Sequence, residues 1–205
     1  MSAKRLSSKL AFFDVDTQRD FMAPSGALYV RGSRMISGRI RQLIAFSAKR
    51  GIRLFSSVDA HVPGDPEMKV FPPHCVVGTR GQQKIRGTLL GDRVVVGLEP
   101  RLSPAAIRAV LAHQQIIFEK QSYGVFDNPN TAAVLRAAGA TRFVVFGVAT
   151  DYCVRAAVLG LLQRGYRVTL VADAIRGVAP AASEKALAEM RKAGAVFKAA
   201  QGVVG

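Results

Sequence analysis

Short apolar runs alternate along the chain with segments in which apolar residues recur every three or four positions. Continuous apolar runs are typical of strands buried on both faces, whereas the second spacing indicates one face of a helix. Strands are predicted at residues 10–15, 52–58, 115–119, 143–148 and 167–172. Helices are predicted at residues 31–50, 103–113, 130–138, 150–164 and 180–193. This alternation predicts a three-layer α/β/α sandwich, in which a mostly parallel sheet has helices on both faces.

Local signals support these boundaries and indicate a single domain. Gly51 closes one predicted helix, and Ser103 is placed to cap the start of another. Residues 59–92 are rich in glycine and proline and predict a long loop, which in a compact domain is usually functional. No repeat or linker interrupts the pattern, so we expect one domain over residues 1–205, with a flexible basic segment at residues 1–9.

The composition is that of an ordinary globular protein. The chain has 205 residues, of which 49% are hydrophobic and 21% charged. No run approaches the roughly 18 apolar residues of a membrane span, so no membrane partner is expected. The basic N-terminus lacks a signal-peptide cleavage site, which predicts a cytoplasmic protein. Cys75 and Cys153 are too few for a disulfide framework, and no Cys-x-x-Cys pair indicates structural zinc.

The net charge of +15 raises the question of a polyanionic partner. The basic residues are scattered, however, and no block of five like charges occurs. No RNA-binding or zinc-finger motif accompanies them. A nucleic-acid partner is therefore not favoured, and a non-catalytic basic binding protein is kept as a remote alternative.

Polar residues follow several of the predicted strands, where the ligands of open α/β sheets bind. Cys153 falls in the first turn of a helix, where the helix dipole and free amides lower a thiol pKa and can hold an oxyanion. A small buried core cysteine is the equally weighted alternative. Lys120 and Asp16 could supply a charge and a proton acceptor beside that thiol. Taken singly, they would be a surface lysine and a strand-end cap.

A second group of polar residues lies in and before the long loop. Asp59, His61 and His74 offer three ligands, the number typical of a catalytic metal site. The alternative, modestly favoured on spacing alone, is that both histidines are exposed to solvent. Cys75 is expected to be packed and neutral. Residues 177–180 lead into a helix but lack a phosphate-binding glycine motif, so we interpret them as a plain loop.

Four segments together carry a resemblance to a known family. They are Val15–Phe21, with the pattern Asp-x-Gln-x-Asp-Phe; the pair of segments 59–61 and 71–79; Lys120 at its strand end; and Gly147–Val154 around the cysteine. In this order they resemble the nicotinamidase branch of the isochorismatase-like cysteine hydrolases. The likeness covers residues 10–198.

The resemblance implies an isochorismatase-like fold with a parallel sheet of about six strands, and an amidase mechanism. Cys153 would attack an amide carbonyl and form a thioester, releasing ammonia. Asp16 would transfer protons, and Lys120 would stabilise charge beside both. The Val148–Ala149 peptide is expected to be cis, with the amides of Ala149 and Cys153 forming the oxyanion hole.

The resemblance also implies a cofactor, a substrate and an assembly. A divalent metal, with zinc favoured over iron or manganese, would bind Asp59, His61 and His74. The implied reaction converts nicotinamide to nicotinate in NAD salvage, with the pyridine nitrogen on the metal. Family members commonly form dimers or tetramers, so a homo-oligomer is expected. The implied substrate-binding residues are Phe21, Phe71, Tyr123, Val148, Ala149 and Tyr152.

This chain departs from the family pattern near the metal. Ala60 stands where the family usually has tryptophan, and Phe71 stands where tryptophan is often found before the second metal histidine. The histidine or serine often found soon after the first metal histidine is missing from residues 64–67. Residues 121–130 also look like those of a less studied subgroup. Another small amide or an isochorismate-like compound therefore remains the alternative substrate.

Overall fold

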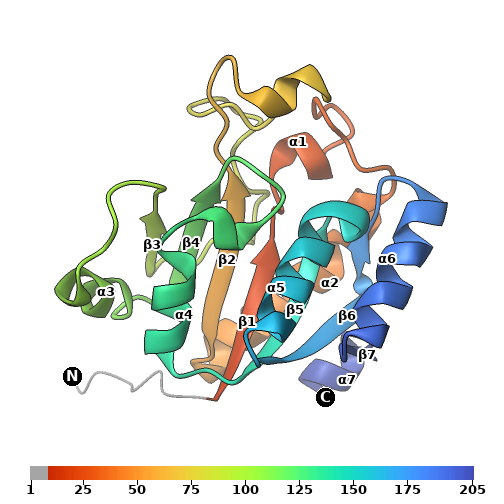
Figure 1. Ribbon diagram of the computed structural model, residues 1–205. Coiled ribbons are helices and arrows are strands. Elements are labelled where there is room, and N and C mark those ends of the chain that lie inside the picture. Colours follow the sequence, from red (N-terminus) through yellow and green to blue (C-terminus); the bar gives the residue numbers. More distant parts are fainter. Residues whose placement is uncertain (1–8) are drawn as a thin grey trace.

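The computed structural model describes residues 9–205, so residues 1–8 of the expected flexible segment lie outside the described residues. Seven parallel strands form one sheet in the order β3-β4-β2-β1-β5-β6-β7 (Figure 1). The strands are β1 (Leu10–Val15), β2 (Arg53–Asp59), β3 (Arg93–Val96), β4 (Gln115–Lys120), β5 (Arg142–Val148), β6 (Arg167–Arg176) and β7 (Val196–Lys198). The predicted α/β sandwich is confirmed.

The helices connect these strands and cover both faces of the sheet. They are α1 (Arg19–Met22), α2 (Ser33–Arg50), α3 (Pro104–Val110), α4 (Thr131–Ala138), α5 (Arg155–Gln163), α6 (Pro180–Lys192) and α7 (Gln201–Val204). Short 3₁₀ turns η1 (Pro66–Lys69) and η2 (Val125–Asp127) and the π turn η3 (Thr150–Val154) complete the chain. No helix within residues 9–205 is long and apolar enough to cross a membrane.

The edge strands β3 and β7 were not expected from the sequence, which predicted about six strands. They have four and three residues, and most of their side chains are partly or fully exposed. Segments so short show neither a continuous apolar run nor a clear alternation, so the hydrophobic pattern gives no signal for them. They extend the two edges of the sheet without changing the fold class.

Two cores lie on opposite faces of the sheet because neighbouring residues of a strand point to opposite sides. Phe13 packs with α4, α5 and α6 on one face, and Phe12 packs with α2 on the other. In Figure 1, α4, α5 and α6 lie in front of the sheet and α2 lies behind it. Both faces of the sheet are therefore covered by apolar side chains. Polar side chains are found instead at the carboxyl ends of the strands.

Local signals at the helix ends agree with the sequence. Gly51 adopts the left-handed conformation with φ of 63° at the end of α2, and Ser103 Oγ accepts from the Ala106 amide at 3.2 Å. The helix predicted from residue 150 begins instead as a π turn, in which the Val154 amide donates to the Ala149 carbonyl at 3.0 Å. Such turns often occur at functional sites.

The long loop between β2 and β3 is held on the sheet rather than hanging free. Lys84 reaches the buried Asp14 of β1, with Nζ 2.9 Å from Oδ2. The Gln18 side chain donates from Nε2 to the Asp59 carbonyl at 2.8 Å and accepts at Oε1 from the Asp59 amide at 2.7 Å. Its Nε2 also donates to the Gln82 carbonyl at 2.9 Å. The turn after β1, the end of β2 and this loop are therefore fixed to one another.

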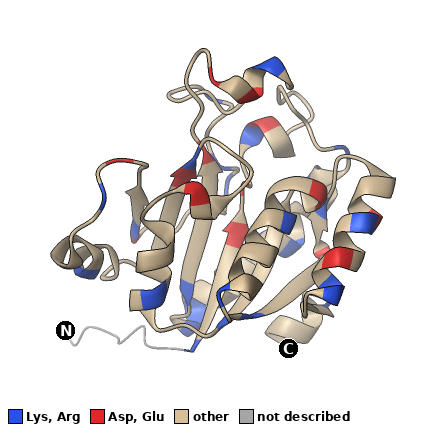
Figure 2. Cartoon of the chain, in the orientation of Figure 1, with Lys and Arg blue, Asp and Glu red and all other residues tan. Residues whose placement is uncertain are grey.

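Charge is distributed unevenly between the sheet and its surroundings. Figure 2 shows lysine and arginine on many separate elements, and acidic residues at the arrowhead ends of β1, β2 and β4. The acidic residues there include Asp16 and Asp59, which are buried. The basic character of the chain therefore belongs mainly to its periphery, whereas the end of the sheet is locally acidic.

Candidate active site

Four of the predicted site residues meet at one edge because parallel strands all end on the same side. Asp16 directly follows β1 and has a positive φ of 46°. Asp59 and Lys120 end β2 and β4 and are register partners. Cys153 lies in η3, directly after β5. The topology thus gathers residues that are up to 137 positions apart in the chain.

Lys120 stands at the centre of this cluster. Its Nζ lies 2.9 Å from Asp16 Oδ2 and 3.5 Å from Cys153 Sγ. It also pairs with Asp59 and donates to the Ser122 carbonyl at 2.9 Å. Lys120 is only 1% exposed, so the alternative of a surface lysine is wrong. A buried ammonium with two carboxylates and a thiol is an arrangement that needs a chemical explanation.

The charges in the cluster support one another. Burial alone would lower the pKa of Lys120, but Asp16 and Asp59 raise it well above its usual value. Burial would raise the pKa of Asp59, but Lys120 and His61 outweigh burial and leave it lowered. Burial raises the pKa of Asp16, and the Asp59 charge adds to this while Lys120 opposes it. Asp16 is therefore the carboxylate better suited to accept a proton.

The expectation that the helix start lowers the pKa of Cys153 is wrong. Burial raises the pKa of this thiol well above its usual value, and Asp16 and Asp59 raise it further against the opposing effect of Lys120. Desolvation and two nearby negative charges outweigh the dipole of a short turn. The thiol therefore rests protonated, and its activation requires a neighbouring proton acceptor.

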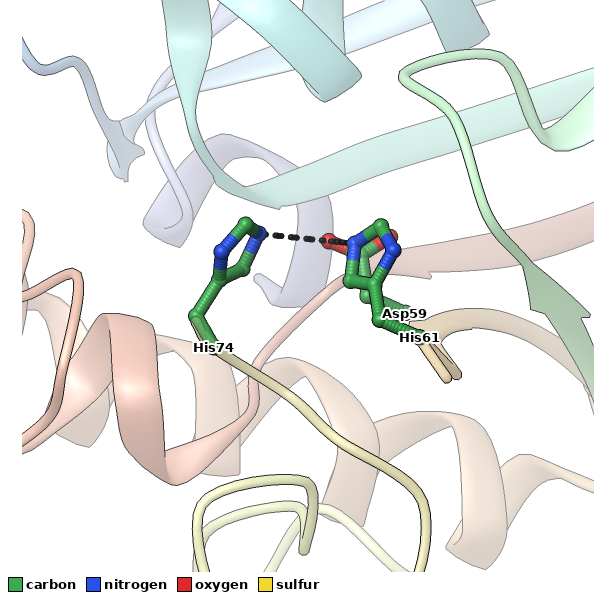
Figure 3. Close-up of side chains that lie close together, drawn as sticks. All are labelled: Asp59, His61 and His74. Carbon is green, nitrogen blue, oxygen red and sulfur yellow. Dashed lines mark ion pairs between the residues drawn. The ribbon is translucent and has the colours of Figure 1, made fainter. Parts of the chain in front are cut away.

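Asp59, His61 and His74 form a second cluster beside the first. One ligand atom of each lies within 4.8 Å of the others, and all three side chains are buried. Figure 3 shows both imidazole rings beside the Asp59 carboxylate. His61 Nε2 lies 3.7 Å and His74 Nε2 4.0 Å from Asp59 Oδ2. The alternative of two solvent-exposed loop histidines is wrong.

The other nitrogen of each ring has its own acceptor. His61 Nδ1 lies 3.0 Å from Asp65 Oδ2, and His74 Nδ1 lies 2.8 Å from the Pro72 carbonyl. These partners favour a proton on Nδ1 and leave Nε2 available as a ligand. His61 Nε2 is buried and has no hydrogen-bond partner within residues 9–205. The cluster therefore fits a bound cation.

Glu67 is a member of this cluster that the sequence analysis missed. Its two carboxylate oxygens lie 3.9 Å from His61 Nε2 and from His74 Nε2. Burial alone would lower the pKa of His61, but Asp59, Asp65 and Glu67 raise it to about 9. The surplus of negative charge favours a cation at this place. Glu67 stands in the segment where the family's additional ligand is missing, which was the only signal for it.

A cavity opens between the two clusters and the surface. Phe71, Tyr123 and Tyr152 form an aromatic wall, with ring centroids 5.2 to 6.5 Å apart. Of the predicted substrate and oxyanion residues, all but Val148 line this cavity, and Val148 is fully buried in the core below. The predicted cis peptide between Val148 and Ala149 is present. The cavity is lined by Phe21, Leu28, Val30, Asp59, Glu67, Phe71, His74, Tyr123, Ala149, Tyr152, Cys153 and Val178.

Comparison with known proteins supports the family resemblance. A family model described as the isochorismatase domain matches residues 11–201. The chain belongs to the isochorismatase family. A nicotinamidase of Escherichia coli strain K12 is 31% identical over 209 residues, which cover 89% of this chain and 91% of that protein. The resemblance to the nicotinamidase branch is thereby confirmed.

Solved structures of two other proteins show the same fold. A pyrazinamidase of Pyrococcus horikoshii in complex with zinc superposes with a TM-score of 0.77 at 29% identity, covering 94% of this chain and 99% of that one. An N-carbamoylsarcosine amidase of Thermoplasma acidophilum superposes with a TM-score of 0.73 at 26% identity, covering 94% and 97%. Both relatives are amidases by name.

Proposed function

We propose that this isochorismatase-family hydrolase converts nicotinamide to nicotinate and ammonia through a thioester on Cys153. The proposal is carried by one observation. A buried cluster of Asp16, Lys120 and Cys153 adjoins an aromatic-walled cavity whose other side holds a metal-binding group. Relatives that act on small amides support this reading.

Asp16 starts the reaction by accepting the Cys153 proton as sulfur attacks the amide carbonyl carbon. This step fits a thiol that rests protonated and a carboxylate whose pKa burial raises. The backbone amides of Ala149 and Cys153 are proposed to bind the oxyanion. Asp16 then gives the proton to the nitrogen as the C–N bond breaks, and ammonia leaves. Water deprotonated by Asp16 hydrolyses the thioester, and the proton returns to Cys153.

The proposed metal site is Asp59, His61 and His74, with Glu67 as an additional carboxylate. The donor set of imidazole and carboxylate suits zinc, and also iron or manganese, so zinc is our first proposal. When bound, such an ion supplies a Lewis-acidic position for the ring nitrogen of a pyridine. Asp59 also pairs with Lys120, so it joins the metal group to the cluster that carries the chemistry.

The cavity favours a flat, aromatic substrate. Its lining within the described residues contains no lysine or arginine, and its carboxylates are Asp59 and Glu67. The rings of Phe71, Tyr123 and Tyr152 suit an aromatic ring. A substrate with an aromatic ring, such as nicotinamide, is therefore better supported than one without a ring.

Ammonia release from nicotinamide by purified, metal-loaded protein tests the proposal. The Cys153→Ala variant is the matched blank, because it keeps the cavity and the metal group. Release that depends on Cys153 supports both reaction and substrate. No release from a folded, metal-bound protein would contradict nicotinamide as the substrate.

A different small amide is the second candidate substrate. Ala60 stands beside the metal group where the family usually places tryptophan, which changes the surroundings of the ligands. The structural likeness to an N-carbamoylsarcosine amidase shows that the same fold can act on an amide without an aromatic ring. A panel of aromatic and aliphatic amides, assayed for ammonia, separates the two candidates.

A further inference from the structure

Asp151 connects the turn around the nucleophile to a distant segment. It lies in η3, two residues before Cys153. Its carboxylate accepts from the Val178 amide at 3.0 and 3.1 Å and from the Ala179 amide at 2.9 Å. These are the two amides that lead into α6, which begins at Pro180.

The start of α6 has few other means of stabilisation. Ala179 is its N-cap and has no side chain that could accept a hydrogen bond, and Pro180 has no amide hydrogen. A carboxylate beside a helix N-terminus is favoured by the helix dipole. A Cβ at Gly177 would crowd the Ser183 hydroxyl and come within 3.0 Å of Asp151 Oδ1. The segment that the sequence analysis interpreted as a plain loop is therefore tightly fitted around Asp151.

Val178 gives this connection a consequence for the site. Its side chain lines the substrate cavity together with Tyr152 and Cys153. It is 48% exposed, so packing alone holds it weakly, and the Asp151 bonds determine where it stands. We infer that Asp151 is a positioning residue that sets the Val178 wall against Cys153 and so limits the size of the amide that enters. That the entering molecule is an amide rests on the proposed function.

A merely structural role for Asp151 makes a different prediction. In that case the bonds only attach α6, and any loss of attachment should have the same effect. Arg155 also attaches α6, because its guanidinium donates to Glu189 at 2.6 and 2.7 Å, and these bonds do not involve residues 177–179. Glu189→Ala is therefore the matched control, because it loosens the same helix away from the cavity wall.

Alkylation of Cys153 tests the inference without requiring any amide substrate. The probes are iodoacetamide and its larger N-phenyl derivative, and mass spectrometry of the Cys153 peptide gives each rate. Asp151→Ala should raise the ratio of the large-probe rate to the small-probe rate roughly tenfold, the factor for losing one charge-assisted hydrogen bond. Val178→Ala should raise it as well, whereas Glu189→Ala should leave it unchanged.

Either of two results would overturn the inference. One is a ratio of the large-probe rate to the small-probe rate that is unchanged in folded Asp151→Ala protein. The other is a rise in that ratio in Glu189→Ala as large as the rise in Asp151→Ala. If Asp151→Ala does not fold, Asp151→Asn keeps one acceptor oxygen and should show a smaller rise. An unchanged ratio in both Asp151→Asn and Val178→Ala would then decide against the inference. Failure of nicotinamide turnover in the wild-type protein would contradict the proposed function, and the alkylation ratios would still decide the role of Asp151.

Discussion

Two aspartate–lysine pairs are buried where β1 ends. Their aspartates are two residues apart in the chain, and the two pairs have different roles. Asp16 pairs with Lys120 and Asp14 pairs with Lys84, both with 2.9 Å between nitrogen and oxygen. The first pair has a second carboxylate, Asp59, and a thiol beside it. Beside the second pair lies the Thr17 hydroxyl, whose Oγ1 donates to Asp14 at 3.1 Å.

The difference shows that surroundings, not the pair itself, decide between chemistry and anchoring. Near Asp16, the negative charge of Asp59 raises the pKa of the Asp16 carboxyl, and the Cys153 thiol is a proton donor within the same cluster. A proton can therefore move between Cys153 and Asp16. The polar side chains that lower the pKa of Asp14 are Lys84 and the hydroxyls of Thr17 and Ser56, so we infer that this pair holds its two segments together. Lys84 belongs to the long loop that also carries His74, and the second pair therefore supports the metal group indirectly.

The largest effect on activity is expected when Asp16 of the first pair, or the neighbouring thiol of Cys153, is replaced. Cys153→Ala should abolish ammonia release because no nucleophile remains. Asp16→Asn should lower kcat by roughly 10²- to 10⁴-fold, the usual contribution of a general acid–base group. Thermal unfolding of Cys153→Ala should stay close to that of the wild type, and circular dichroism should show that Asp16→Asn is folded at the assay temperature. Wild-type rates in either variant would remove the first pair from the chemistry.

Breaking the second pair should instead act on stability, with a defined pH dependence. Lys84→Met should lower the free energy of unfolding by about 3–5 kcal/mol, because it leaves a buried carboxylate without its partner. Burial already raises the pKa of Asp14 although Lys84 opposes this, and the variant raises it further. The folded state then keeps a proton that the unfolded chain releases. Stability is therefore retained below the ordinary aspartate pKa and lost as the pH rises through the raised one.

Urea unfolding of Lys84→Met between pH 4 and pH 8 measures this loss. The double variant Asp14→Asn with Lys84→Met is the control, because it has no carboxyl group to titrate and should show a loss that is independent of pH. A pH-independent loss in Lys84→Met itself would show that Asp14 does not respond to Lys84.

The sequence predicts the first pair far better than the second. Asp16, Lys120 and Cys153 stand at strand ends, where the topology of a parallel sheet brings them together. Asp14 is conspicuous in an apolar run, but nothing in the pattern names its partner. Lys84 lies in a segment rich in glycine and proline and has the appearance of a solvated loop residue. Loop conformation, not periodicity, places Lys84 and Glu67, and for that reason sequence patterns missed both.

A smaller effect is expected at the metal-binding group, which Asp59 joins to the first pair. Glu67→Gln removes one negative charge that faces both histidines, and metal affinity should fall roughly tenfold or more, as for other groups that support a metal ligand. Competition for zinc against a chromophoric chelator measures this affinity without any assay of turnover. Glu184→Gln, an exposed substitution on α6, is the matched control. Equal zinc affinities in the two variants would exclude Glu67 from the metal group.

The smallest effect is expected from replacing two neighbouring serines of β2, Ser56 and Ser57. Because they are consecutive in a strand, their side chains lie on opposite sides of the sheet, one beside each pair. The Ser56 hydroxyl lowers the pKa of Asp14 and accepts from the Gln115 side-chain amide at 3.0 Å, whereas the Ser57 hydroxyl lowers the pKa of Asp16. Ser56→Ala should cost about 1 kcal/mol of unfolding free energy and leave the pH profile of kcat/KM unchanged. Ser57→Ala removes a hydroxyl that lowers the pKa of Asp16, so that pKa should rise. Because the reaction needs unprotonated Asp16, the acid limb of the profile should then move to higher pH. A shift of equal size in Ser56→Ala would show that the two aspartates titrate as one group, and the distinction between the chemical pair and the anchoring pair would fail.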